Sequence, residues 1–366
     1  MADTPDVCPV EDLPDELGTT VAGELAHNGI TSPQHVAERG DCEPHDGLGD
    51  LERFRVELTG YCYRMLGSPF DAEDAVQETF LRAWRSRSSF DPSRASVRTW
   101  LYRIATNLCF DTLKTATRRR ELAVDMGPPF PLGPDLGTPL PEESWVLPIA
   151  DARAVPHTSD PVEQVTVRES IRLAFVAALQ LLPPRQRAVL ILRDVLRCTS
   201  AEAAGILGAT TATVNSAMQR ARTTLADARP TPAPLDPASE DLLSRYCEAF
   251  ENDDIDALLA LLHEEGTTSM PPFPWWLRGR RAIEAALRAP GDPCGGSRLV
   301  PVHANGTTAV AQYAPEDGGH LRPFGLTVME WSDGQMIASI TFLEKPSRMF
   351  RMFGLTDEFQ EAASYP

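Results

Sequence analysis

The strongest chemical signal in the chain is a pair of helical patterns joined by a glycine, TSAEAAGILGATTATVNSAMQRARTTL (residues 199–225). Thr199 and Glu202 predict a capping box for the first helix, and Gly208 predicts the turn after it. On the second helix the expected buried stripe is Val214, Ala217, Met218, Ala221 and Leu225. The opposite face supplies the candidate DNA contacts Thr211, Asn215, Ser216, Gln219, Arg220 and Arg222. These polar side chains suit base edges and phosphates, although an ordinary helical hairpin is the alternative.

A second stretch with the chemistry for nucleic acid is VRTWLYRIATNLCFDTLKTATRRR (residues 97–120). Basic residues interleaved with aromatics indicate contacts to unstacked bases and to phosphates. The candidate contacts are Arg98, Trp100, Arg103, Asn107, Asp111 and Lys114. The expected buried stripe is Leu101, Ile104, Ala105, Leu108 and Thr112. The preceding loop (85–98) is rich in Ser and Arg and is a candidate pocket for a base turned out of the duplex. We expect Trp84 and Trp100 to be largely core, and the arginines at 118–120 to close the helix.

An acidic helix precedes these segments at DAEDAVQETFLRAW (residues 71–84). Ser68 followed by Pro69 predicts its start. Its apolar stripe is Ala72, Val76, Phe80 and Ala83, with Trp84 at the edge, and Asp71, Asp74 and Glu78 lie opposite. Taken alone, the acidic side indicates either a solvated face or a docking surface for a basic partner.

The net charge of −18 over 366 residues hides two basic blocks. Residues 51–120 hold 13 basic and 8 acidic side chains, and residues 167–229 hold 9 and 4. Acidic segments flank and separate them. Polyanion binding is therefore expected in the two basic blocks, which contain both candidate DNA-binding helices.

Composition also indicates the compartment in which the chain works and the cofactors it could bind. No apolar run approaches 18 residues, and the acidic N-terminus lacks the order of a secretion signal, so no membrane association is expected. Seven scattered cysteines without a CxxC pair favour free thiols in a reducing cytoplasm. The set His35, Cys42 and His45 matches no common zinc spacing, so we expect neither a metal nor another cofactor.

The expected organisation is multi-domain, and its helical part precedes an α+β part. An acidic extension (1–49), expected to be disordered, leads into a helical domain (50–120) and an acidic Pro/Gly-rich linker (121–161). A second helical domain (162–229) and a short Pro linker (230–237) follow. The α+β domain (238–350) begins with helices over about 239–262 and 280–288 and continues in four strand-like runs, of which the last two are joined by an SDG turn. Residues 351–366 form a tail.

Residues 50–229 resemble an extracytoplasmic-function sigma factor, the compact class of the bacterial sigma-70 family. The segment at 71–85 resembles the core-binding helix of the family, and 98–113 resembles its promoter-melting and minus-ten-reading helix. LPPRQRAVLILRDVL with the helix-turn-helix resembles its minus-thirty-five-reading domain. The resemblance implies two all-α domains and contact with core RNA polymerase, at the largest-subunit coiled-coil and the flap. The implied polymerase contacts are Asp71, Asp74, Gln77 and Glu78. Asn215 and Ala217 depart from the basic residues that the family often has on its recognition helix.

The C-terminal region resembles the cone-shaped α+β SnoaL-like fold, most distinctively in MPPFPWWLRG (residues 270–279). Members of that fold include isomerases, cyclases and hydrolases. The candidate acid–base residues are His263, His303, Tyr313 and Glu330, but their spacing shows no recognisable pair. We expect a regulatory or ligand-sensing module that takes an unidentified small ligand. Phe273, Trp275 and Trp276 are its candidate regulatory contact, or else they line the cone.

These features together predict a sigma factor without enzymatic activity or cofactor, regulated by its C-terminal domain. It would bind core polymerase and promoter DNA in the cytoplasm. The alternative is a helix-turn-helix regulator fused to a ligand-binding or cyclase-like domain. Such a regulator would need neither the acidic helix nor the aromatic–basic helix, so these two segments favour the sigma factor.

Overall fold

A computed structural model describes residues 51–115, 119–133, 135–157, 160–228, 239–289, 295–316 and 320–359. The predicted disordered extension, the second linker and residues 360–366 of the predicted tail lie outside these ranges, as do His35, Cys42 and His45. Within the described ranges, no helix combines the length and hydropathy needed to span a bilayer.

The first helical domain packs α2 (Arg55–Leu66), α3 (Pro69–Arg85) and α4 (Val97–Thr115) around a buried core. The predicted start of α3 is confirmed, because the Ser68 hydroxyl accepts a hydrogen bond from the Asp71 amide and Pro69 occupies the first turn. Two expectations are wrong. Trp84 is 61% exposed, since it lies at the edge of the apolar stripe and stacks on Arg87 at 4.5 Å. Thr112 is exposed, and its hydroxyl donates to the Leu108 carbonyl of its own helix.

The predicted linker is more buried than its Pro/Gly-rich composition indicates. It contains α5 (Asp151–Ala154), and residues 144–150 are all buried. The Leu147 amide donates to the Gly67 carbonyl at 2.9 Å, and Tyr63 donates to the Leu147 carbonyl at 2.8 Å. The cause is the apolar run WVLPIA, which packs against the first helical domain inside an otherwise acidic segment.

The second helical domain contains five helices and a π-helical turn at Ile191–Val195. The helices are α6 (Pro161–Glu169), α7 (Leu173–Gln180), α8 (Pro184–Leu190), α9 (Ser200–Leu207) and α10 (Thr211–Ala228). The predicted capping box of Thr199 and Glu202 is confirmed, and Gly208 adopts the left-handed conformation that ends α9. On α10, four residues of the predicted stripe are buried and Leu225 is half-buried.

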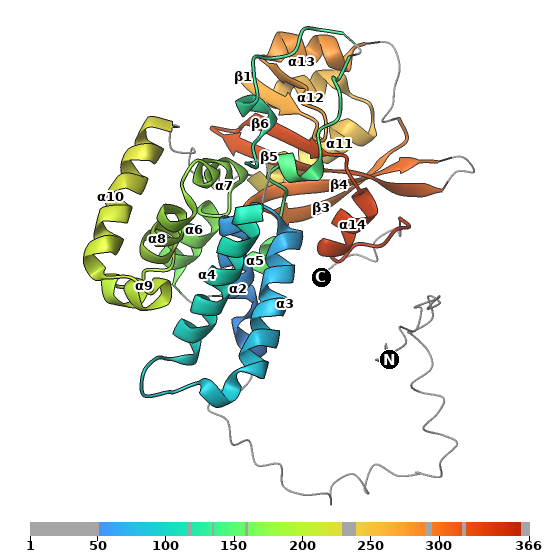
Figure 1. The fold of residues 1–366 in the computed structure, drawn as a ribbon. Helices are drawn as coiled ribbons and strands as arrows, with labels where there is room; N and C mark the ends of the chain where they lie inside the picture. Colours follow the sequence, from blue (N-terminus) through green and yellow to red (C-terminus); the bar gives the residue numbers. More distant parts are fainter. Residues whose placement is uncertain are drawn as a thin grey trace, which may run out of the picture. The chain divides into compact units, whose positions relative to one another are not determined.

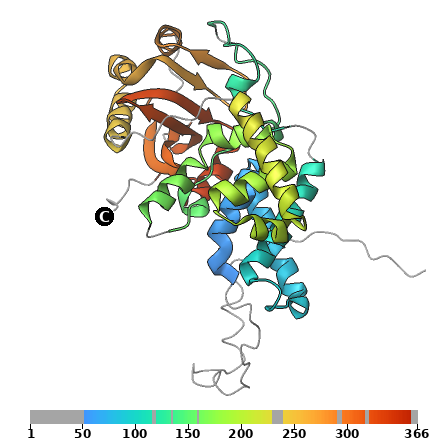
Figure 2. The ribbon, with the colours of Figure 1, turned by 90° about the vertical axis from the view of Figure 1, so that its left-hand side faces the viewer.

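The C-terminal domain is built on a six-stranded sheet in the order β2-β1-β6-β5-β4-β3, with α11 to α13 beside it (Figures 1 and 2). Only β1 and β6 pair in parallel among these strands. The strands are β1 (Leu262–Ser269), β2 (Trp276–Arg278), β3 (Arg298–Ala304), β4 (Thr307–Pro315), β5 (Leu321–Ser332) and β6 (Gln335–Phe342). The helices are α11 (Ser239–Glu251), α12 (Ile255–Leu261), α13 (Arg280–Leu287) and α14 (Pro346–Met352).

Three elements of this domain escape prediction from the sequence. β1 carries a polar sequence, LHEEGTTS, and owes its strand conformation to pairing with β2 and β6 rather than to local propensity. β2 is only three residues long. α14 extends beyond the predicted domain end at residue 350, because Met349, Phe350 and Met352 are buried.

Candidate functional site

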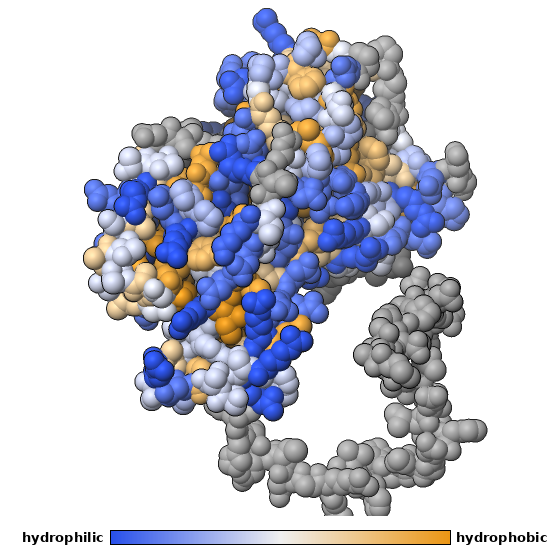
Figure 3. Space-filling view, viewed as in Figure 1, coloured by the Kyte–Doolittle hydropathy of each residue, from blue (hydrophilic) through white to orange (hydrophobic). Residues whose placement is uncertain are grey.

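The exposed face of α3 carries the residues implied to bind polymerase. Asp74 and Gln77 are exposed, and Glu78 is about one-third exposed and pairs with Arg82 at 2.7 Å. Leu81 and Trp84, which are 44% and 61% exposed, continue the same stripe towards the end of the helix. In Figure 3, apolar patches lie among charged side chains over α3 and α4. This face therefore joins carboxylates to an apolar end, and the sequence pattern indicated only the acidic part.

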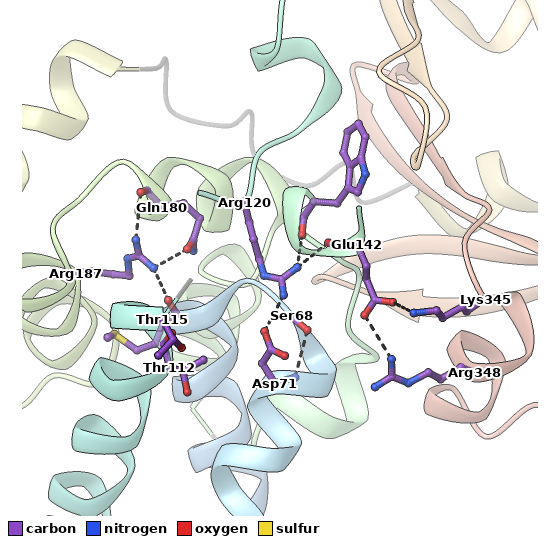
Figure 4. Close-up of polar contacts among 12 residues, drawn as sticks. Ser68, Asp71, Thr112, Thr115, Arg120, Glu142, Gln180, Arg187, Lys345 and Arg348 are labelled. Carbon is purple, nitrogen blue, oxygen red and sulfur yellow. Dashed lines mark hydrogen bonds and ion pairs between the residues drawn. The ribbon is translucent and has the colours of Figure 1, made fainter. Parts of the chain in front are cut away.

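Asp71 differs from the other three candidates, because its carboxylate, although 36% exposed, is paired with a residue from a distant segment of the chain. Its carboxylate pairs with Arg120 at 2.7 Å, and the same guanidinium donates to the carbonyls of Glu142 and Trp145 at 2.9 Å each (Figure 4). Arg118 lies outside the described residues, and the expectation that arginines 118–120 close the preceding helix is wrong for Arg119 and Arg120, which are not helical. α4 ends at Thr115, and Arg120 joins the start of α3 to the linker.

On α4 the candidate DNA contacts fall into two groups. Arg103, Asn107, Asp111 and Lys114 are exposed at three- and four-residue spacing, which places them on one stripe. Arg98 is instead tied to its own domain. It pairs with Glu57 at 2.9 Å and lies 4.9 Å from the centre of the Tyr102 ring. Although burial opposes its charge, Tyr102 and Glu57 raise the pKa of Arg98 above its ordinary value.

Trp100 is half-buried and packs against Phe90 of the preceding loop, with ring centres 4.9 Å apart. It therefore supports this loop and is less completely buried than expected. The exposed stripe of α4 remains the part of the helix that is open to a ligand.

The candidate DNA face of α10 is open. Thr211, Asn215, Ser216, Gln219, Arg220 and Arg222 are all exposed. Beside them lies an open hollow of about 380 Å³, lined by Arg193, Asn215, Met218, Gln219, Arg222 and Thr223. Arg222 pairs with Asp194 at 2.8 Å, so the sequence places it on the predicted face but does not reveal its partner.

Two buried arginines join the helical domains. Arg64 of α2 donates to the Ser170 hydroxyl at 2.7 and 3.0 Å and to the Val167 carbonyl at 3.3 Å. Arg187 of α8 donates to the Met65 carbonyl and to Gln180. Burial lowers the pKa of each arginine to about 10. Because a buried guanidinium is costly without partners, these carbonyls and hydroxyls stabilise the packing of one domain on the other.

The turn between β3 and β4 connects the C-terminal domain to both helical domains and to the linker. Asn305 is fully buried, and its amide donates to the Tyr63 hydroxyl and to the Ile171 carbonyl at 2.6 Å each. Its side-chain oxygen accepts from the Ile149 amide at 3.0 Å. The next residue, Gly306, donates its amide to Asp151 at 2.8 Å. The turn thus holds three segments that are distant in sequence.

α14 provides a second connection, at the N-terminal end of α3. Arg348 lies 3.6 Å above the centre of the Phe70 ring, and Lys345 pairs with Glu142 at 2.7 Å (Figure 4). Arg153 bridges the two helices by donating to Glu73 of α3 and to the Met352 carbonyl. The C-terminal domain therefore contacts the helix whose exposed face is the candidate polymerase surface.

The aromatic loop predicted as a regulatory contact faces inward. Trp275 is 7% exposed and belongs to the core of the C-terminal domain, while Phe273 is half-buried beside that core. Trp276 is 3% exposed, and its indole donates to the Gly127 carbonyl of the linker at 3.2 Å. The Phe130 amide donates to the Trp276 carbonyl at 2.9 Å. The loop thus contacts the linker through Trp276.

Replacing the two tryptophans separately should distinguish these environments. Trp275→Ala is expected to destabilise the C-terminal domain by roughly 3–5 kcal/mol, because it leaves a large cavity. Trp276→Phe keeps most of the volume and removes the bond to Gly127, so it should speed amide exchange near Phe130 without unfolding the domain. Hydrogen exchange and thermal unfolding measure both effects. A Trp275→Ala variant as stable as wild type would contradict this assignment.

The four ionisable residues considered for catalysis do not converge. Glu330 pairs with Arg172 of the second helical domain at 2.9 Å, and Tyr313 donates to the Thr356 carbonyl at 2.9 Å. His303 is exposed, with Glu240 at 3.7 Å. His263 accepts from the Glu265 amide at 3.1 Å. No group of three metal-ligating side chains is found in the part of the chain that the structure describes.

Comparison with protein families gives three matches in chain order. The model for sigma-70 region 2 matches residues 51–119, that for sigma-70 region 4 matches 172–225, and that for the SnoaL-like domain matches 243–339. These ranges correspond to the first helical domain, most of the second, and the sheet domain.

Individual relatives cover more of the chain. This chain is 43% identical over 343 residues to a protein described as ECF RNA polymerase sigma factor SigG from Mycobacterium tuberculosis. The match covers 91% of this chain and 88% of the relative. This chain is 32% identical over 222 residues to SigJ of the same species, covering 60% of this chain and 63% of SigJ. The crystal structure of SigJ superimposes with a TM-score of 0.55 and 25% identity, covering 83% of this chain and 98% of that chain.

Proposed function

The chain belongs to the extracytoplasmic-function (ECF) RNA polymerase sigma factors, and on that premise we propose which of its surfaces bind polymerase and promoter DNA. As a sigma factor it binds core RNA polymerase and promoter DNA and directs transcription initiation, which in a bacterium takes place in the cytoplasm.

We assign core binding to the exposed face of α3. The observation that carries this assignment is the stripe of Asp74, Gln77 and Glu78, which is open to solvent on a helix whose other face is buried. Carboxylates on such a face fit a basic partner, which we take to be the coiled-coil of the largest polymerase subunit. Asp71 has an internal partner in Arg120, so we assign it to holding α3 in place rather than to contacting polymerase.

Leu81 and Trp84 extend this surface. Both are exposed on the same side of α3, and an exposed tryptophan beside carboxylates is a typical interface anchor. Trp84 was expected in the core, and only its position at the edge of the apolar stripe hinted otherwise. We propose that the two side chains add apolar contact area to the charged contact with polymerase.

We assign promoter DNA to two further faces. The exposed stripe of α4 (Arg103, Asn107, Asp111 and Lys114) suits the minus-ten element, and Trp100 supports the adjacent loop against Phe90. The open face of α10 suits the major groove of the minus-thirty-five element. We place the polymerase flap against the second helical domain, as the family resemblance implies.

Two substitutions on α10 should separate base reading from phosphate binding. Gln219→Ala should relax base preference within the minus-thirty-five element, at a cost of roughly 1–3 kcal/mol for a good base contact. Arg222→Ala should instead weaken binding to all sequences alike, because Asp194 already engages its guanidinium. Footprinting of the holoenzyme on matched promoter variants measures both. Identical behaviour of the two variants would contradict this placement.

We propose that the C-terminal domain regulates the sigma domains by holding them together. The Asn305–Gly306 turn contacts both helical domains and the linker, and α14 contacts α3 and the linker residue Arg153. A ligand that prefers one arrangement could shift this balance, since only differential binding changes a conformational equilibrium. We assign no catalysis, because the ionisable candidates are engaged separately among the described residues.

Co-purification with core polymerase is the experiment that tests this function directly. Full-length protein mixed with core enzyme should elute as one complex on gel filtration and should bind promoter fragments only in that complex. A protein that bound DNA tightly alone and never associated with core polymerase would instead be the helix-turn-helix regulator considered as the alternative.

A further inference from the structure

Two polar side chains of the recognition helix α10 are held by residues outside it. The Ser200 hydroxyl, at the start of α9, donates to the Asn215 side-chain oxygen at 2.9 Å. Asp194, in the π-helical turn, accepts from Arg222, with Oδ1 2.8 Å from Nη2 and Oδ2 3.4 Å from Nε. Asn215 and Arg222 both line the open hollow of about 380 Å³, and Gln219 lies between them in sequence. The hollow is thus bounded by side chains whose orientation is set from neighbouring elements.

The bond from Ser200 changes what Asn215 can offer to a base. An asparagine amide has one acceptor oxygen and two N–H donors. Reading adenine takes the oxygen and the nitrogen together, because adenine presents an N6 donor beside its N7 acceptor. Guanine presents two acceptors, N7 and O6. With one lone pair of the oxygen used and the amide plane held by Ser200, both N–H donors remain for the groove.

The pair with Asp194 restricts Arg222 in a similar way. A guanidinium reads guanine through two parallel N–H donors, and Asp194 occupies the Nε and Nη2 edge. Arg222 keeps its charge and the donors of its Nη1–Nη2 edge, which can reach a phosphate oxygen, but its guanidinium is held in one orientation. The two tethers thus direct the Asn215 N–H donors towards bases and fix the orientation of the Arg222 guanidinium.

We propose that Ser200 and Asp194 are positioning residues for promoter readout, and that Ser200 makes Asn215 select guanine over adenine at one base pair of the minus-thirty-five element. This inference rests on the proposed function, in which α10 lies in the major groove. Neither residue needs to touch DNA. The start of α9 is set separately by the capping box of Thr199 and Glu202, so removing the Ser200 hydroxyl leaves the helix intact.

The test uses holoenzyme, reconstituted from core polymerase and the full chain, and a promoter library randomised across the minus-thirty-five element. Bound sequences are counted for wild type, Ser200→Ala, Asn215→Ala and Asp194→Ala. Ser244→Ala is the matched control, since its hydroxyl donates to the Glu240 carbonyl within α11. For Ser200→Ala we expect the guanine-to-adenine ratio at one base pair to fall at least fivefold, with affinity for the best sites changed less than twofold. Asp194→Ala releases the Arg222 guanidinium from its fixed orientation and should change the base preference at a second base pair.

The outcomes separate the inference from the function beneath it. If Asn215→Ala alters no base preference, the placement of α10 is wrong and the inference is overturned with it. If Asn215→Ala alters a preference that Ser200→Ala leaves unchanged, only the positioning role is overturned. A uniform loss of affinity in Ser200→Ala, without a change in base preference, also overturns it, because that is the result of a purely structural role.

Discussion

Replacing Asn305 by alanine is expected to lower the apparent Kd for core polymerase by about tenfold or more. Its side chain makes three hydrogen bonds at a fully buried site, and the substitution leaves the Ile149 amide and the Ile171 carbonyl without it. Each buried group left unsatisfied costs about 1–3 kcal/mol. This cost falls only on the closed arrangement, in which the C-terminal domain holds the two helical domains together. If polymerase binds sigma domains that have separated, every 1.4 kcal/mol on the closed state is roughly a tenfold gain in apparent affinity.

Gly306→Ala provides the same test with a matched control. A Cβ at Gly306 would lie 2.4 Å from the Arg168 carbonyl oxygen, whereas one at Gly334 would meet no atom within 4 Å. Both glycines follow a residue with positive φ in a hairpin turn, at φ +73° and +74°, so the backbone strain is alike. Anisotropy titration with core polymerase should show tighter binding for Gly306→Ala than for Gly334→Ala. Equal or weaker binding would contradict the restraining role of the turn.

Reversing charge on the core-binding helix is expected to abolish association with polymerase. Asp74→Arg with Glu78→Arg places positive charge opposite a basic partner, and like charges across an interface cost several kcal/mol. Both side chains are at the surface, so the circular dichroism spectrum and thermal stability should be close to wild type. Asp241→Arg with Glu248→Arg makes the same change in charge on exposed positions of α11 and controls for net charge.

Trp84→Ala tests the apolar end of the same face. Because the side chain is 61% exposed, the fold should persist while polymerase binding weakens by roughly 1–3 kcal/mol. Gel filtration with core polymerase and a binding titration measure polymerase affinity for Trp84→Ala and for the Asp74→Arg and Glu78→Arg variant. Unchanged binding by the charge-reversal variant would show that α3 is not the docking surface.

Local rules made the helical domains readable from the sequence. Ser68–Pro69 and the Thr199–Glu202 box predict helix starts because each involves residues three or fewer apart. The buried stripe of α10 follows from helical spacing alone. Even there, single positions at the edge of a stripe are ambiguous, and Trp84 fell on the solvent side.

Contacts between distant segments could not be read in the same way. An Asn–Gly pair predicts a hairpin turn, but nothing local shows that Asn305 reaches Tyr63 and Ile171. Burial of Arg64 and Arg187 depends on carbonyl groups contributed by other helices. Proline, glycine and acidic residues predict a linker over 121–161, although its short apolar run WVLPIA is a signal for burial.

Run-off transcription by core polymerase, on promoters selected from the randomised library, tests the central claim most directly. Full-length protein should produce a transcript with a defined start that core polymerase alone does not make. That transcript should disappear with the Asp74→Arg and Glu78→Arg variant and become stronger with Asn305→Ala at limiting polymerase. No defined transcript with wild-type protein, or equal transcription by the charge-reversal variant, would contradict the account.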